Sequence, residues 1–278
     1  MPHEQPYSMM TASLVRPVRV LRVSPEGVSS RADVAATEEP VEVRIDGDPF
    51  AVIMRTPGAD RELAAGFLFA ERVILAASDI ERIERDPRER NVMDVGIRDA
   101  RDHDSRARNR RRVVTSSSCG LCGRVTIESL RVEAPEILAD WTIDANLIAT
   151  LPDALRRAQA VFNETGGLHA AGLFDRSGNL EAMAEDVGRH NAVDKVIGRM
   201  LLEGRLPLEH SVLFVSGRTS YEIVQKAFLA GVPVLGAVSA PSSLAVELAE
   251  EAGITLLGFV RGSTFNLYSH ARRVAGWR

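Results

Sequence analysis

The residues best suited to chemistry are two cysteines separated by two positions. Cys119 and Cys122 are the only cysteines in the 278-residue chain, and a glycine follows each of them. Glycine lets neighbouring backbone approach closely and leaves the sulfurs exposed. Four hydroxyl residues, 115–118, precede the pair and Arg124 follows it. Because nearby arginines favour the thiolate, the pattern predicts a reactive thiol pair rather than two inert side chains.

From the residues alone, four kinds of chemistry compete for this pair. A structural zinc ion needs four ligands, so two cysteines would have to be shared across a dimer. A thioredoxin-like redox pair normally lies between a strand and a helix, whereas this one follows a stretch with six arginines, residues 101–112. A zinc deaminase would carry a His-x-Glu sequence before the pair, and none precedes Cys119. The fourth is sulfur transfer, in which one thiolate carries sulfur as a persulfide and the second thiol assists.

The second candidate site lies where three apolar runs end. Residues 211–215, 232–238 and 254–260 read as buried strands, each followed by small, hydroxylated or basic residues. Ligands of open parallel sheets gather outside such strand ends, and two of these loops lead into helix N-termini that favour anions. Arg218 and Arg261 are suited to binding phosphate oxygens. The pattern predicts a phosphate or nucleotide site, although ordinary capping explains any one loop and no Walker A motif or complete Gly-x-Gly-x-x-Gly fingerprint is present.

Further polar residues surround the predicted start of a helix at 191–202. In the run 185–191, His190 is suited to acid–base work and Arg189 to anion binding. The simpler interpretation is helix capping, with residues 194–195 on a solvated face. His169 lies among small and apolar residues, so we expect a hydrogen-bonded core histidine.

The elements that must position these residues follow from hydrophobic periodicity. Alternating residues 41–45 and 50–54 flank an Asp-Gly turn and predict a hairpin. A second hairpin is expected over 168–173 and 180–184. Helices are predicted near 60–74, 142–162, 191–202, 220–231 and 243–252, and further strands at 18–23, 92–97 and 113–114.

Near-continuous apolar strands that alternate with helices predict an α/β fold with a mixed, largely parallel sheet. We divide the chain into a disordered tail at 1–15, a smaller β-rich N-terminal domain at 16–140 that ends in the cysteine loop, and an α/β domain at 141–278. The arginine-rich stretch 101–112 is expected to be a solvated loop, or alternatively a patch that binds an anionic ligand or a partner.

Composition narrows the class of protein. The chain is 45% hydrophobic and 26% charged with a formal charge of −4, which is ordinary for a globular protein and argues against binding nucleic acid as a whole. No apolar run reaches the length of a membrane span, and the first residues do not resemble a signal peptide. We therefore expect a cytoplasmic protein without a membrane partner.

The motifs jointly resemble the formate dehydrogenase accessory sulfurtransferases, the FdhD family, from about residue 18 to 268. Five blocks carry the resemblance: Arg55-Thr56-Pro57-Gly58 with Glu62–Leu68, Ser118–Gly123, Gly166–Ala171, Glu185–Lys195 and Ser216–Glu222. The resemblance implies that the C-terminal domain is cytidine-deaminase-like and lacks the deaminase zinc site, so no metal held by protein side chains is expected.

The same resemblance implies an activity and partners. The protein would take sulfur from a cysteine desulfurase and pass it to the molybdenum bis(molybdopterin guanine dinucleotide) cofactor, bound as substrate, before formate dehydrogenase receives that cofactor. Cys119 would carry the persulfide and Cys122 would assist. The family's cofactor-binding stretch corresponds to Phe259, Val260, Arg261, Gly262, Ser263 and Thr264, to which the first strand end adds Ser216, Gly217 and Arg218. A homodimer is implied. Two other classes stay open: a cofactor-binding chaperone without sulfur transfer, and a dithiol redox protein.

Overall fold

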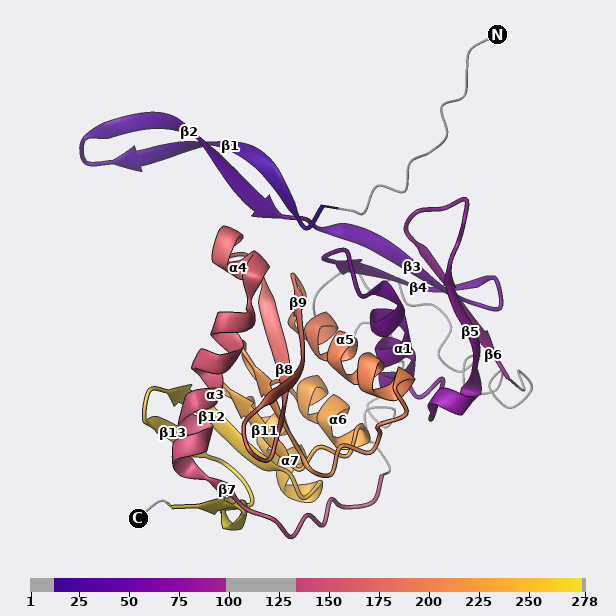
Figure 1. Cartoon of the computed structure of the whole chain (residues 1–278), viewed down its shortest axis with the longest axis vertical. Coiled ribbons are helices and arrows are strands. Elements are labelled where there is room, and N and C mark those ends of the chain that lie inside the picture. Colours follow the sequence, from indigo (N-terminus) through magenta and orange to yellow (C-terminus); the bar gives the residue numbers. More distant parts are fainter. Residues whose placement is uncertain (1–12, 99–133, 277–278) are drawn as a thin grey trace.

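The computed structural model describes residues 13–98 and 134–276 (Figure 1). The cysteine pair, the arginine-rich stretch 101–112 and the strand predicted at 113–114 lie outside the described residues, so these predictions stay untested. In the described part the protein is a mixed α/β structure, as the alternation of apolar strands and helices predicts.

A six-stranded sheet forms the centre, in the order β13-β12-β11-β10-β8-β9. The strands are β8 (His169–Asp175), β9 (Leu180–Asp186), β10 (Ser211–Val215), β11 (Val234–Ala237), β12 (Thr255–Arg261) and β13 (Thr264–Leu267). Neighbours β10, β11 and β12 run parallel, while β8, β9 and β13 join antiparallel. The predicted parallel strands and the predicted hairpin of β8 and β9 are thus confirmed.

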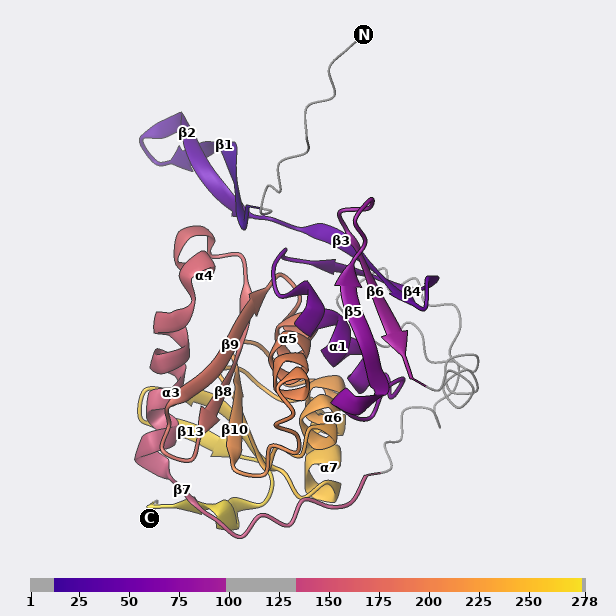
Figure 2. The ribbon, with the colours of Figure 1, turned by 45° about the vertical axis from the view of Figure 1, so that its right-hand side comes forward.

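Helices cover both faces of this sheet (Figures 1 and 2). Helices α5 (Arg189–Leu202), α6 (Tyr221–Leu229) and α7 (Ser243–Glu251) lie on one face, and α3 (Ala145–Ala158) and α4 (Ala160–Thr165) on the other. Alternate residues of β10 reach both layers: Leu213 belongs to the core cluster with α5, and Phe214 to the cluster with α3. Strands buried on both faces explain why the sequence shows continuous apolar runs.

The helix predicted over 142–162 is instead two helices that meet at Gln159. That residue has φ −78° and ψ 79°, outside helical geometry, and it ends α3 and precedes α4. Gly166 then ends α4 in a left-handed conformation, at φ 67°, which glycine adopts without strain. The short strand β7 (Ile143–Asp144) directly precedes α3. It pairs in parallel with the short strand β14 (Val274–Ala275).

The N-terminal part adds a four-stranded sheet in the order β4-β3-β6-β5, with α1 (Asp60–Ala70) packed against it. Its strands are β3 (Glu39–Ile45), β4 (Asp48–Arg55), β5 (Ile80–Arg85) and β6 (Val92–Ile97). The hairpin of β3 and β4 is confirmed, with Asp46 and Gly47 both at positive φ in the turn. One core cluster contains Val43 of this sheet together with Val196 of α5. The division at residue 140 stays a prediction.

A separate two-stranded sheet extends from the body of the molecule (Figures 1 and 2). It consists of β1 (Val15–Ser24) and β2 (Gly27–Ala36), which pair antiparallel and are mostly exposed. The strand predicted at 18–23 is thus confirmed. In the described residues, no helix is long and apolar enough to cross a membrane.

Helices α1 and α5 approach each other unusually closely. A methyl group on Gly198 would lie 1.9 Å from the backbone oxygen of Glu62, and one on Gly66 would lie 2.0 Å from that of Asp194. Only glycine fits at these two positions. The Gly66 and Gly198 contacts therefore set the spacing of the two helices.

This packing overturns the prediction that residues 194–195 form a solvated face. Asp194 and Lys195 are only 2% and 3% exposed, because α1 and α6 cover that side of α5. Asp194 Oδ1 lies 2.5 Å from Lys226 Nζ, and Lys195 Nζ lies 2.7 Å from Asp186 Oδ2. Paired opposite charges are the usual condition under which such side chains are buried.

Candidate functional site

The three predicted strand-end loops are joined by backbone hydrogen bonds. Thr219 N donates to Ala240 O at 3.2 Å, and Ser242 N donates to Thr219 O at 3.0 Å. Phe259 N donates to Ser239 O at 3.2 Å. The loops after β10, β11 and β12 therefore form one continuous edge, as expected for the carboxyl ends of parallel strands.

The loop after β12 differs from the other two because it turns back into β13. Arg261 pairs with Thr264 across this turn, and Gly262 adopts φ 54°. Arg261 Nε donates to Val238 O at 3.1 Å, and its guanidinium lies 5.8 Å from the exposed Phe259 ring. Val260, one of the predicted cofactor-binding residues, has a fully buried side chain. It could therefore contact a ligand only through its backbone.

The first loop is anchored to the start of β8. Ala170 N donates to Ser216 Oγ at 2.8 Å, and Ser216 N donates to Ala170 O at 3.0 Å. Gly217 lies against His169: a methyl group there would be 3.2 Å from the imidazole Nδ1. Arg218 is exposed. The arrangement brings together the predicted residues Ser216, Gly217 and Arg218 with His169.

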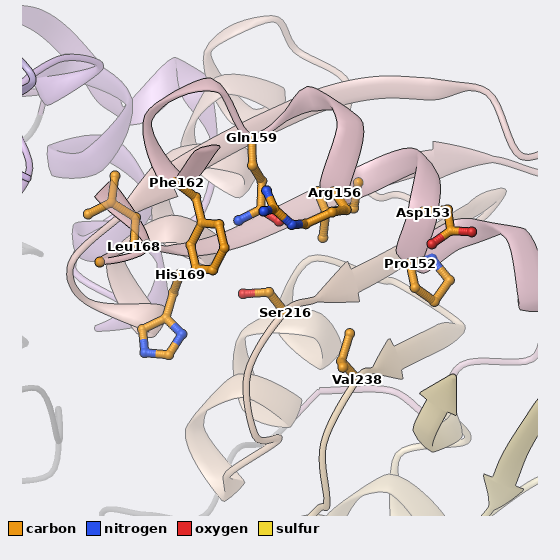
Figure 3. A pocket seen from close by; sticks show the side chains of 12 residues that line it. Pro152, Asp153, Arg156, Gln159, Phe162, Leu168, His169, Ser216 and Val238 are labelled. Atoms are coloured by element: carbon orange, nitrogen blue, oxygen red, sulfur yellow. The ribbon is translucent and has the colours of Figure 1, made fainter. Parts of the chain in front are cut away.

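A pocket of about 510 Å³ opens beside these loops (Figure 3). Ser216 and Val238 line it from the strand ends, and α3, α4 and the segment before β8 supply the other walls. The full lining is Pro152, Asp153, Leu155, Arg156, Gln159, Phe162, Gly166, Gly167, Leu168, His169, Ser216 and Val238. This volume suits a small-molecule ligand.

His169 is a half-buried part of the pocket wall, not the core residue that its apolar neighbours in the sequence predict. Burial lowers the pKa of its imidazole, and the positive charge of Arg189 lowers the pKa further. The charge of Arg218 acts in the same direction, so Arg189 and Arg218 together create a positive electrostatic potential around His169. Such a potential favours an anionic ligand.

We expect the stability of the protein to fall as the pH drops through the depressed pKa of His169. The folded state binds this proton less tightly than the unfolded chain, so the stabilisation is present above the ordinary value of 6.5 and is lost on acidification. Urea unfolding at pH 8, 7, 6 and 5.5 checks the sign, and His169→Gln should flatten that dependence. An identical pH dependence in the variant would remove His169 as its cause.

His190 joins the starts of two helices. Its Nε2 lies 3.1 Å from Ser220 Oγ and 3.0 Å from Glu222 Oε2. Ser220 and Glu222 lie at the N-terminal end of α6, directly after the Ser216–Ser220 loop. Because His190 is only 7% exposed, the geometry favours a positioning role for it. The predicted acid–base role remains untested.

Six pocket residues escaped the sequence analysis, all from α3, α4 and their junction: Pro152, Asp153, Leu155, Arg156, Gln159 and Phe162. Gln159 could have been found in the sequence, because it continues a row of apolar residues at helical spacing. Ile148, Leu151 and Leu155 recur at helical spacing and are buried, and Gln159 follows at the next such position and is equally buried. In the described residues no group of three or more His, Cys, Asp or Glu side chains is placed to hold a metal ion.

The fold and site define a mixed α/β protein with a ligand-sized pocket beside the carboxyl ends of parallel strands. The chain matches the FdhD/NarQ family over residues 36–275. It is 50% identical to the sulfur carrier protein FdhD of Nocardia farcinica over 92% of this chain and 93% of the relative. It is 44% identical to the protein of that name from Sulfurisphaera tokodaii, over 94% and 99% of the two chains.

A solved structure agrees with this assignment. The crystal structure of a protein described as a formate dehydrogenase accessory protein, from Desulfotalea psychrophila, superposes with a TM-score of 0.76 at 27% identity. The match covers 94% of this chain and 100% of that chain. The protein belongs to the FdhD/NarQ family.

Proposed function

We propose that this protein is a sulfur carrier required for formate dehydrogenase activity. It accepts sulfur from a cysteine desulfurase as a Cys119 persulfide and passes it to the molybdenum bis(molybdopterin guanine dinucleotide) cofactor, which it binds as a substrate. The observation that carries the proposal is the 50% identity to a protein named as a sulfur carrier, over nearly the whole of both chains. The cysteine pair supplies the chemistry that such a role needs.

The two thiols of the chain can carry out both steps of the proposed sulfur transfer. The Cys119 thiolate attacks the outer sulfur of the desulfurase persulfide, forms Cys119–S–SH and releases the donor's thiolate. The Cys122 thiolate then attacks the inner sulfur, which forms a Cys119–Cys122 disulfide and expels hydrosulfide. The two thiols supply the electron pair that reduces the sulfur, and an external thiol reduces the disulfide before the next cycle.

The strand-end loops and the pocket support the proposed cofactor site. Arg218 and Arg261 provide guanidinium groups for phosphate oxygens, and two of the loops lead into the N-terminal ends of α6 and α7, where the helix dipole favours an anion. The positive potential around His169 has the sign that a dinucleotide needs. The role of residues 259–264 rests on the family resemblance together with this placement.

The family resemblance supports further proposals. We propose a cytidine-deaminase-like architecture for residues 141–278, a separate domain for 16–140, and a homodimer located in the cytoplasm. Its partners would be the desulfurase and formate dehydrogenase, with no nucleic acid or membrane.

Replacement of Arg261 with alanine is expected to weaken binding of GDP, used as a probe for the cofactor's nucleotide moieties. Loss of one charged hydrogen bond costs about 1–3 kcal/mol, which is roughly a 5- to 150-fold loss in affinity. Isothermal titration calorimetry measures it. Arg199→Ala is the matched control, because Arg199 pairs with Glu203 near the far end of α5. Equal affinities in the Arg261 variant and the control would remove Arg261 from the site.

The physiological role is tested in a host whose own copy of the sulfur carrier is deleted. Expression of this chain should restore formate dehydrogenase activity, and the double variant Cys119→Ala, Cys122→Ala should not. If the double variant restored activity fully, the chaperone without sulfur transfer would be the better description.

A further inference from the structure

The sheet of β1 and β2 has one apolar face. We call residues 15–36 the arm, because they extend beyond the body of the molecule (Figures 1 and 2). Alternate side chains of a strand point to opposite faces, and the antiparallel register places ten side chains of the arm on one of them. Eight of these ten are apolar, namely Val15, Pro17, Leu21, Val23, Val28, Ala32, Val34 and Ala36. Three of the four arginines of the arm lie on the other face: Arg16, Arg22 and Arg31.

The outer part of this apolar face is bare in the part of the chain that the structure describes. Leu21, Val23 and Val28 are 70%, 75% and 66% exposed. The inner end lies near the body, where a methyl group on Gly167 would be 3.7 Å from Ala36 Cβ. A lone two-stranded hairpin is at best marginally stable in water, and contiguous exposed apolar surface marks interaction sites. The tip of the arm therefore needs a covering surface.

Contacts at the root hold the arm in its extended position. Thr37 N donates a hydrogen bond to Leu14 O at 2.9 Å. Arg16 pairs with Glu39, whose Oε2 also lies 3.8 Å from Arg55 Nη1. Glu39 and Arg55 are buried, so this ionic group links the arm to the N-terminal sheet. Because these contacts direct the tip away from its own body (Figure 1), the cover of the tip must come from another molecule.

We propose that the arm docks, apolar face inward, on the body of a second copy of this chain, and that the arm of that copy docks in return. The inference rests on the homodimer of the proposed function and assigns the surface that forms it. Reciprocal contacts of this kind are those of a two-fold symmetric dimer. The two strands of one arm hold ten residues each, whereas a standard interface uses roughly 20–30 residues a side. Two arms with their receiving surfaces are therefore large enough for a stable dimer.

Charge favours a copy of the chain as the occupant. The arm carries four arginines against Glu26 and Asp33. The described residues outside it, 37–98 and 134–276, carry 30 acidic side chains of Asp and Glu against 21 basic side chains of Lys and Arg. A basic arm is thus attracted to an acidic body, and complementary charge of this kind speeds association and selects the partner.

Light scattering of the full-length protein after size exclusion tests the docking surface. Wild type should have twice the mass of one chain. In the double variant Leu21→Ser, Val23→Ser, the dissociation constant of the dimer should rise about 30-fold or more, because two aliphatic side chains lose their burial. The matched control is Val18→Ser, Val20→Ser, which changes the same strand on its opposite face and should remain a dimer. Circular dichroism verifies that both proteins are folded.

Photocrosslinking identifies what the arm contacts. Benzoylphenylalanine replaces Leu21, and protein labelled with the light and the heavy isotope of nitrogen is mixed in equal amounts before irradiation. We expect crosslinked peptides that join a light chain to a heavy chain, and these peptides locate the receiving surface. Crosslinks confined to single chains would overturn a second copy as the occupant. So would crosslinks that form only after a desulfurase or formate dehydrogenase is added.

Other results separate this inference from the proposed function. A dimer that the Leu21 and Val23 variant leaves intact would place the interface elsewhere, and the homodimer would stand without the arm. Equal dissociation of both double variants would exclude the apolar face as the docking surface. A monomeric wild type would exclude both the docking and the homodimer. Sulfur acceptance by Cys119, measured by mass on the same proteins, judges the sulfur-carrier proposal independently in each case.

Discussion

Alanine in place of Cys119 is expected to abolish sulfur acceptance. After incubation with a cysteine desulfurase and cysteine, the intact mass of wild type should increase by about 32 Da, one sulfur atom on a thiol. The variant should show no such adduct, since the remaining Cys122 is proposed only to resolve the persulfide. The expected effect is all or nothing, because no second persulfide carrier is assigned in the chain.

Cys122→Ala is the matched control for this experiment. It should acquire the adduct at a rate close to that of wild type, but it should release little hydrosulfide, because the attack that forms the disulfide is lost. Methylene blue detection of sulfide measures the release. An adduct of the same size and rate in Cys119→Ala would exclude Cys119 as the carrier. A reversed pattern would exchange the roles of the two cysteines.

Alanine in place of Gly198 is expected to give the largest loss of stability from a single methyl group. In a helix interior, Gly→Ala is ordinarily favourable by up to about 1 kcal/mol. Here the added carbon would lie 1.9 Å from the backbone oxygen of Glu62, so α1 and α5 must separate. Overpacking of this kind typically costs about 1–3 kcal/mol and occasionally more. The steric term therefore outweighs helix propensity, and we expect a net loss of about 2 kcal/mol or more.

Urea unfolding measures this loss, with Gly167→Ala as the control. A methyl group on Gly167 would meet no atom closer than 3.7 Å, and that residue has no positive φ. The control should change the free energy of unfolding by less than about 0.5 kcal/mol, as surface substitutions usually do. A Gly198→Ala protein as stable as the control would mean that the close contact of α1 and α5 does not set their packing.

The central sheet could be predicted from the sequence because its signals are local. The strands at 211–215 and 254–260 are continuous apolar runs, and each helix between the parallel strands ends near a glycine, Gly231 or Gly253, at positive φ. The burial of Asp194 and Lys195 could not be predicted in this way. Lys226, the partner of Asp194, and the α1 backbone that covers this side come from distant parts of the chain, and the pairing of Lys195 with the nearby Asp186 depends on how the chain turns from β9 into α5.

The same difference between local signals and tertiary packing applies to the candidate site. Arg218 and Arg261 were predicted because strand ends and loops are contiguous in the sequence, and the structure joins those loops through backbone hydrogen bonds. The opposite wall, with Gln159 and Phe162, was missed because it is formed by a helix break. Where α3 ends depends on packing against the sheet, and propensity alone does not determine that boundary.

Transfer of labelled sulfur tests the central claim most directly. The protein is loaded with radiolabelled sulfane sulfur by a desulfurase, separated from the donor, and incubated with the bis-guanine-dinucleotide molybdenum cofactor and cofactor-free formate dehydrogenase. The account predicts that label leaves Cys119, appears on the cofactor, and restores formate oxidation in proportion. Label that remains on the protein while formate oxidation is fully restored would contradict sulfur carriage as its function.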